Sequence, residues 1–178
     1  LDLIPSEIDL ALAESYMPGR VGAELFLARA LKTVSEQYDV VLIDSPPSVG
    51  KLSAMGALAA DMLIVPIPTR NKGLLALRGL SEVLMQYHLL KPSLHVGIYV
   101  PTMYNARRNH DKEALAFMEG KLSPLATAVP ERGAVWNDAG VEGKSVVEFA
   151  PKSEAASDVR RLTAEVAKIM GLAYEVNA

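Results

Sequence analysis

Hydrophobic and polar residues alternate along the chain with two different periods. Short, continuous apolar runs are typical of strands that are buried on both faces of a sheet. The chain has four runs of this kind, at residues 40–43, 62–67, 96–100 and 125–129. The opening stretch LDLIPSEIDL predicts a further strand, which leads into a turn at Pro5-Ser6 with Ser6 as a candidate helix cap.

Between these runs, apolar residues recur at the spacing of a helix that buries one face. Four such stripes are present, at residues 21–34, 74–84, 115–122 and 159–170. Gly171 follows the last stripe and is a typical helix stop. Helices that alternate with apolar strands predict a parallel sheet flanked by helices. The pattern therefore predicts a single α/β domain over residues 1–178.

The composition excludes several classes of site. The chain has no cysteine, which excludes disulfides, cysteine-ligated zinc or iron–sulfur clusters, and a cysteine nucleophile. No apolar run approaches the roughly 18 residues of a membrane-spanning helix. The formal net charge is −3, so any nucleic-acid surface is expected to be a local patch in the second half of the chain.

Asp44 follows the apolar run 40–43 directly. In parallel α/β sheets, ligands bind beyond the carboxyl ends of the strands. An apolar strand that ends in aspartate is the Walker B arrangement, whose carboxylate helps to hold Mg²⁺, often through water, beside nucleotide phosphates. A helix cap or an exposed strand end is the alternative interpretation, and the spacing alone leaves both open.

The residues after Asp44 predict a stiff loop. Pro46 and Pro47 have restricted φ angles and no N–H, Ser45 is held extended by the proline after it, and Ser48 and Gly50 favour a turn. Such a loop suits a nucleotide-dependent switch. An ordinary proline-rich connection between strand and helix is the alternative.

The stretch YDVVLIDSPPSVG, residues 38–50, resembles the Walker B and switch II segment of the ParA/MinD superfamily of deviant-Walker ATPases. Further stretches are similar to that superfamily and follow in the same order. They are LDLIPSEIDLALAE, ALAADMLIVPIPT, ALRGLSEVL, MYNARRN, VPERG, EGKSVVEFAPKSEAA and the closing helix. The resemblance covers essentially the whole chain. The sequence is therefore identified as a ParA/Soj-type partition ATPase with a P-loop NTPase-like fold.

The resemblance implies roles for particular residues. Asp44 is expected to be catalytic and to bind Mg²⁺ through water, and the switch II residues are Ser45, Pro46, Pro47, Ser48 and Gly50. The residues expected to border the adenine of ATP are Tyr104, Asn105 and Pro130. The residues expected to contact DNA are Arg107, Arg108 and Arg132, and Lys112 and Lys144 could join them.

The sequence departs from the family pattern in two places. The family opens with a strand and a KGGxGKT phosphate loop that this chain lacks. The candidate substitute GVEGKS, residues 140–145, has the wrong spacing and leads into a strand-like VVEF, so we expect an exposed turn. The stretch PTRNKGLLAL, residues 68–77, is longer and more basic than its family counterpart.

The expected protein is thus a longer ATPase, of which this chain is the carboxyl-terminal two-thirds, without the first strand and P-loop. The chain alone is expected to bind ATP weakly or not at all. The resemblance implies an ATP-dependent homodimer in the cytoplasm, bound non-specifically to nucleoid DNA and released when a ParB-like partner stimulates hydrolysis. The alternatives are a MinD-like or other cargo-positioning ATPase, and a non-catalytic interaction domain; the acidic end GLAYEVNA argues against a membrane anchor.

Overall fold

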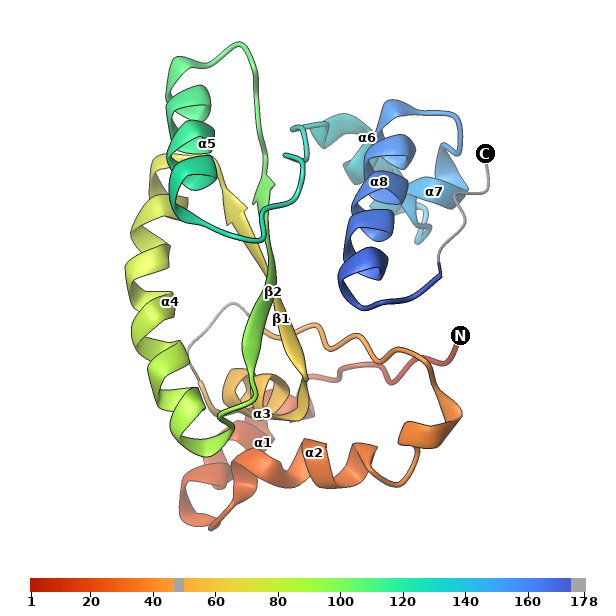
Figure 1. Ribbon diagram of the computed structural model, residues 1–178. Coiled ribbons are helices and arrows are strands. Elements are labelled where there is room, and N and C mark those ends of the chain that lie inside the picture. The colour runs from red at the N-terminus through yellow and green to blue at the C-terminus, as the bar shows by residue number, and fades with distance from the viewer. Residues whose placement is uncertain (47–49, 174–178) are drawn as a thin grey trace. The chain divides into compact units, whose positions relative to one another are not determined.

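The computed structural model describes residues 1–46 and 50–173 (Figure 1). Its strands are β1 (Met62–Pro68) and β2 (His95–Thr102). Its α-helices are α1 (Asp9–Tyr16), α2 (Phe26–Leu31), α3 (Lys51–Ala59), α4 (Asn71–Leu90), α5 (Asn109–Lys121), α6 (Gly133–Val141), α7 (Val146–Phe149) and α8 (Glu154–Ile169). Shorter 3-10 turns are η1 (Met17–Gly19), η2 (Ala23–Leu25) and η3 (Ser35–Gln37).

The predicted parallel sheet is confirmed for the strands β1 and β2. Strands β1 and β2 pair side by side and point the same way, with α4 as the crossover between them (Figure 1). Residues 125–130 continue the parallel pairing on β2, because Ala126 N–H donates to the Tyr99 carbonyl at 2.8 Å and Val129 N–H donates to the Pro101 carbonyl at 2.8 Å. The expected strands at 62–67 and 96–100 are therefore confirmed, and 125–129 pairs through isolated bridges.

Two predicted strands are wrong. Residues 40–43 and the opening residues 1–4 are not in strands, and neither segment makes a backbone–backbone hydrogen bond with another described residue. A strand is defined by its ladder of hydrogen bonds to a neighbour, and apolar character alone does not supply one. Ser6 does not cap a helix, because α1 begins at Asp9 and Ile8 precedes it without a side-chain cap.

The predicted helices are largely confirmed. The stripes at 74–84, 115–122 and 159–170 correspond to α4, α5 and α8, with Leu122 and Met170 as the C-caps of the last two, whereas 21–34 is divided between η2, α2 and a turn. Helix α8 ends as predicted: Gly171 has φ +69°, and Leu172 N–H donates to the Ala167 carbonyl at 2.9 Å. This pair of features is the Schellman motif, which satisfies the last carbonyls of a helix.

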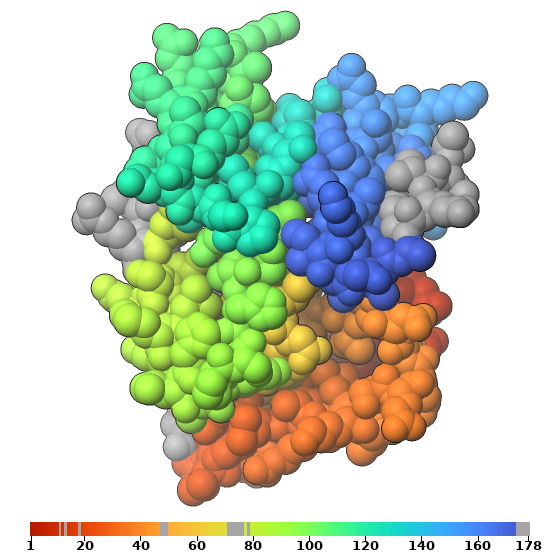
Figure 2. Space-filling model, in the orientation of Figure 1, coloured from red at the N-terminus to blue at the C-terminus, as the bar shows by residue number. Residues whose placement is uncertain are grey.

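The chain forms two compact units. The first unit comprises Leu1–Leu63 and Ser81–His95, and the second comprises Ile64–Leu80 and Val96–Ala178. In the first unit, α2 and η2 pack on α3, with Ala23 and Leu58 buried. The second unit has one core cluster around α6, α7 and α8 and another in which Leu162 and Val166 of α8 pack against residues of β2 and Ala126. The side chains of α5 (green) and α8 (blue) are visible on the face shown in Figure 2.

No helix within residues 1–46 and 50–173 is both long enough and apolar enough to cross a membrane.

Candidate functional site

The loops after the parallel strands of the second unit come together by hydrogen bonding. Thr69, the residue after β1, donates its N–H to the carbonyl of Thr102 at 3.0 Å, and its hydroxyl donates to the carbonyl of Met103 at 3.4 Å. Met103 has φ +55°, a conformation that is costly for a residue with a long side chain. Backbone strain of this kind concentrates at functional loops, so the turn after β2 is a candidate site.

The loop that carries the predicted DNA arginines is held in place by Asp111. This carboxylate is fully buried, and its Oδ2 accepts the N–H of Asn105 at 2.8 Å. The Asn105 side-chain oxygen in turn accepts the N–H of Arg107 at 3.0 Å, as in an Asx turn. The other oxygen, Oδ1, lies 2.7 Å from His110 Nε2, but the contact lacks hydrogen-bond geometry, so Oδ1 has no hydrogen-bond partner among the described residues.

The residues expected to border adenine lie together in the second unit. Tyr104 and Pro130 form a parallel bridge, in which Tyr104 N–H donates to the Val129 carbonyl at 3.1 Å and Glu131 N–H donates to the Tyr104 carbonyl at 2.9 Å. Tyr104 and Pro130 also line an open hollow. The other residues that line the hollow are Leu115, Glu119, Leu125, Ala126, Thr127, Ala128, Arg132, Asp158 and Arg161.

Arg107 and Arg108 differ in what their side chains contact. The Arg107 side chain is exposed and has no hydrogen bond or ion pair to any described residue. The Arg108 guanidinium donates to the Glu131 carboxylate at 2.9 Å. Arg70, after β1, donates to the other oxygen of the same carboxylate. Arg107 is therefore the cation of this pair that is available to an external anion.

The Asp44 segment lies in the first unit. Asp44 is exposed, and its carboxylate has no partner among the described residues. The preceding and following residues pack close to Gly56 of α3, where an added Cβ would lie 2.6 Å from Ser45 Oγ and 3.3 Å from Ile43 Cγ2. A glycine at position 56 thus allows the segment to approach the helix closely.

The remaining switch residues are described in part. The Ser53 hydroxyl donates to the Pro46 carbonyl at 3.1 Å, and Gly50 immediately precedes α3. Pro47 and Ser48 lie outside the described residues. Among the described residues no group of three His, Asp or Glu side chains could hold a metal ion, and Asp44 is an exposed carboxylate without a partner there. One hard oxygen ligand fits a Mg²⁺ ion that keeps several waters.

Comparisons with known proteins give the same assignment as the motifs. A family model described as an AAA domain (AAA_31) matches residues 1–98. The probable plasmid-partitioning protein ParA of Thermus thermophilus is 37% identical over 174 residues, covering 93% of this chain and 53% of that protein. The sporulation initiation inhibitor protein Soj of Bacillus subtilis is 31% identical over 175 residues, covering 94% of this chain and 67% of Soj. The chain belongs to the ParA/Soj family of ATPases.

Solved structures agree with the ParA/Soj assignment of the fold. The cobyrinic acid a,c-diamide synthase of Mycobacterium smegmatis, with bound ADP and magnesium, is 31% identical with a TM-score of 0.66. The match covers 73% of this chain and 54% of that one. The chain spans about half the length of the Thermus thermophilus ParA relative that it matches.

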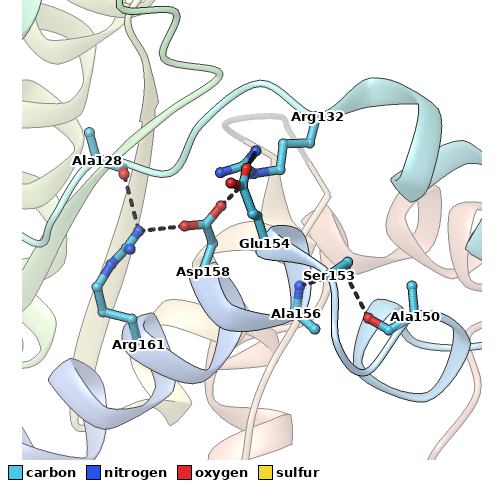
Figure 3. A network of polar contacts seen from close by, with 8 residues as sticks. All are labelled: Ala128, Arg132, Ala150, Ser153, Glu154, Ala156, Asp158 and Arg161. Carbon is cyan, nitrogen blue, oxygen red and sulfur yellow. Dashed lines mark hydrogen bonds and ion pairs between the residues drawn. The ribbon is translucent and has the colours of Figure 1, made fainter.

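A ParA/Soj protein that binds DNA through Arg132 would have to detach that residue from a carboxylate network (Figure 3). Arg132 Nε donates to Asp158 Oδ2 at 2.7 Å, and its Nη1 donates to Glu154. The hydrogen bond to Asp158 is the main cause of the raised pKa of Arg132. The Arg132–Asp158 hydrogen bond joins the segment before α6 to α8, and within α8 Arg161 Nη2 donates to Asp158 Oδ1 at 2.9 Å.

The GVEGKS segment is exposed; its first two residues end α6, and the expected turn follows at residues 142–143. Gly143 has φ +64°, and Lys144 forms an ion pair with Glu142 at 2.8 Å. The strand-like interpretation of VVEF is wrong, because these residues form α7. Ser145 and Glu148 make a reciprocal capping box at its start, and this local hydrogen bonding outweighs the strand preference of the two valines.

Asp111 and Glu131 were not singled out in the sequence. A carboxylate in the first turn of α5 is a recognisable signal, since it suits the positive end of the helix. Glu131 has no local signal, because its partners at positions 70 and 108 are distant in sequence.

Proposed function

We propose that residues 1–178 form the carboxyl-terminal part of a single ParA/Soj-type ATPase domain that partitions a plasmid or chromosome region. ATP would join two subunits, and the dimer would bind DNA non-specifically. A ParB-like partner would stimulate hydrolysis and release the dimer from the nucleoid in the cytoplasm. The names and the extent of the relatives support this proposal.

The nucleotide site would be shared between this chain and the remainder of the protein. Mg²⁺, which is bound with ADP in the Mycobacterium smegmatis relative, neutralises phosphate charge when it is present. Asp44 would hold a water ligand of that ion, and residues 45–50 would sense the terminal phosphate. The base would lie against the backbone at Tyr104, Asn105 and Pro130, where the bridge between two parallel segments keeps the wall of the hollow in place.

The observation that carries the DNA proposal is the exposed Arg107 side chain on a loop ordered by Asp111. Non-specific DNA binding requires cations that neutralise phosphates and release counterions, and it needs no base contacts. Arg108 would contribute less than Arg107 to the affinity for DNA, because Glu131 partly neutralises its charge. Arg132 would contribute least, because two carboxylates hold it.

The test is the affinity of the full-length protein for random-sequence duplex DNA with ATP, with ADP and without nucleotide, across a salt series. We expect tight binding only with ATP. Arg107→Ala should weaken binding to all sequences alike and reduce the salt slope by about one. Lys121→Ala, at the other end of α5, removes the same charge and is the matched control. Binding that ignores ATP, or an equal loss in both variants, would contradict the proposal.

A further inference from the structure

Three loops of the second unit meet at one carboxylate. Arg70 follows β1, Arg108 follows β2, and Glu131 follows the pairing segment 125–130. Arg108 donates to Glu131 Oε2 at 2.9 Å, and Arg70 donates to Glu131 Oε1. We call these three residues the Glu131 cluster. It lies beyond the carboxyl ends of parallel segments, where α/β proteins bind their ligands.

The Glu131 cluster has an excess of positive charge and is open to solvent. Two guanidinium groups face one carboxylate, so the cluster carries a net charge of +1. The side chains of Arg70, Arg108 and Glu131 are 48%, 40% and 28% exposed. Guanidinium groups bind phosphate oxygens with the same forked geometry that they use for carboxylates.

The Glu131 side chain can leave the two arginines without disturbing the backbone. The N–H of Glu131 donates to the Tyr104 carbonyl at 2.9 Å, and this hydrogen bond does not involve the carboxylate. Partly exposed ion pairs contribute little to folding stability, so their exchange for another anion has a low cost.

We propose that Arg70 and Arg108 form a binding position for a phosphate group and that Glu131 is its internal counter-ion, which a DNA phosphodiester displaces. The inference rests on the proposed function, because it concerns the regulation of the same DNA surface. Glu131 lowers the affinity for DNA by competing with phosphate for the two guanidinium groups. Contact with DNA frees the carboxylate to turn outward, while the backbone of the loop stays in place.

Two observations favour DNA over the phosphates of a bound nucleotide. The neighbouring residue Arg107 is exposed on the same loop and has no internal partner among the described residues, so it extends the cationic surface. In addition, neither Arg70, Arg108 nor Glu131 lines the hollow beside Tyr104 and Pro130. Both observations support an external polyanion as the ligand of the cluster.

The test uses the full-length protein with ATP and measures the dissociation constant for random duplex DNA across a salt series. Glu131→Gln should tighten binding about three- to tenfold and steepen the salt slope by about one, because the net charge of the cluster rises from +1 to +2 and no carboxylate competes with phosphate. This gain should vanish when Arg70→Ala and Arg108→Ala are added to Glu131→Gln. ATP affinity, measured in a parallel arm, should stay unchanged in Glu131→Gln.

Glu36→Gln is the matched control, since Glu36 is exposed on η3 and its carboxylate has no ion pair with a described residue. An equal gain in Glu36→Gln, a gain that survives loss of both arginines, or a change confined to ATP affinity would each overturn the inference. If wild-type protein binds DNA through Arg107 and Glu131→Gln changes nothing, only this inference fails. If wild-type protein with ATP does not bind DNA, the proposed function fails and the inference fails with it.

Discussion

At the scale of single residues, Asp158 is a buried carboxylate that holds two arginines near the candidate site. It is 5% exposed and accepts hydrogen bonds from both Arg132 and Arg161. Asp158→Ala should lower the free energy of unfolding by about 2 kcal/mol, below the range for fully buried pairs because water screens both guanidinium groups. Urea denaturation at neutral pH measures the difference.

Glu154→Ala is the control for that substitution. Glu154 also accepts from Arg132, but its side chain is 80% exposed, so its loss should change the free energy of unfolding by about 0.5 kcal/mol or less. Equal losses in the two variants would show that burial does not set the strength of this network.

The sequence proposes residues for the site but not their partners. Asp44, Tyr104 and Arg107 each lie in a local motif, and their roles in the site stay predictions. Glu131 and Asp158 could not be recognised in that way, since their roles depend on arginines that the fold brings close from distant positions. Whether an arginine is available to a ligand is decided by such carboxylates.

At the scale of elements, the start of α7 predicts an acid-dependent contribution to stability. Hydrogen bonds from the Ser145 side chain, and then from its backbone, lower the pKa of Glu148 below 4.5. A carboxyl whose pKa is lowered on folding stabilises the fold above its unfolded pKa and loses that effect as pH falls through its folded pKa. Glu148→Gln should therefore flatten the decline in stability below about pH 4.5.

Thermal unfolding at a series of acidic pH values checks this dependence. Ser145→Ala should flatten the same acidic part of the stability–pH curve. At neutral pH it should lower the free energy of unfolding by about 1 kcal/mol, because the helix cap is lost. Ser157→Ala, an exposed serine within α8, should leave the pH dependence as it is. If Glu148→Gln loses stability with falling pH as steeply as the wild type does, the capping box is excluded as the source of that pH dependence.

Two helical glycines give opposite predictions for one substitution. A Cβ at Gly56 in α3 would lie 2.6 Å from Ser45 Oγ, whereas one at Gly79 in α4 would meet nothing within 4 Å. Gly79→Ala should stabilise the protein by about 0.5–1 kcal/mol through helix propensity. Gly56→Ala should instead displace the Asp44 segment and reduce ATP hydrolysis by the full-length protein. Denaturation curves measure the stability of each variant, and steady-state phosphate release measures its ATP hydrolysis. Equal changes in both quantities for the two variants would contradict the close approach at Gly56.

Elements with local signals were predicted well, and those that need distant partners were not. The helical stripes of α4, α5 and α8 follow from periodicity, and Gly171 marks a stop. Residues 40–43 have the composition of a buried strand but lack a pairing neighbour among the described residues. The S-x-x-E signature at Ser145 was present in the sequence and outweighed the β-branched residues that followed.

At the scale of the whole molecule, exposed apolar side chains predict self-association of the isolated chain. Leu3, Ile4 and Leu42 are 84%, 87% and 78% exposed in segments without backbone pairing to described residues. Unpaired extended segments of this kind are templates for intermolecular strand pairing. Sedimentation velocity should show concentration-dependent oligomers. The double variant Ile4→Lys/Leu42→Lys should lower the oligomeric fraction. Val141→Lys, at an equally exposed valine that ends α6, should leave them unchanged.

The Glu131 cluster also has an evolutionary consequence. A single base change converts either glutamate codon into a lysine codon. At position 131 this change would replace the only anion of the cluster with a third cation, while the backbone hydrogen bond to Tyr104 would persist. If the Glu131 cluster binds DNA as we propose, a lineage can alter the time that its protein spends on the chromosome in one mutational step, without first acquiring a new fold or a new loop.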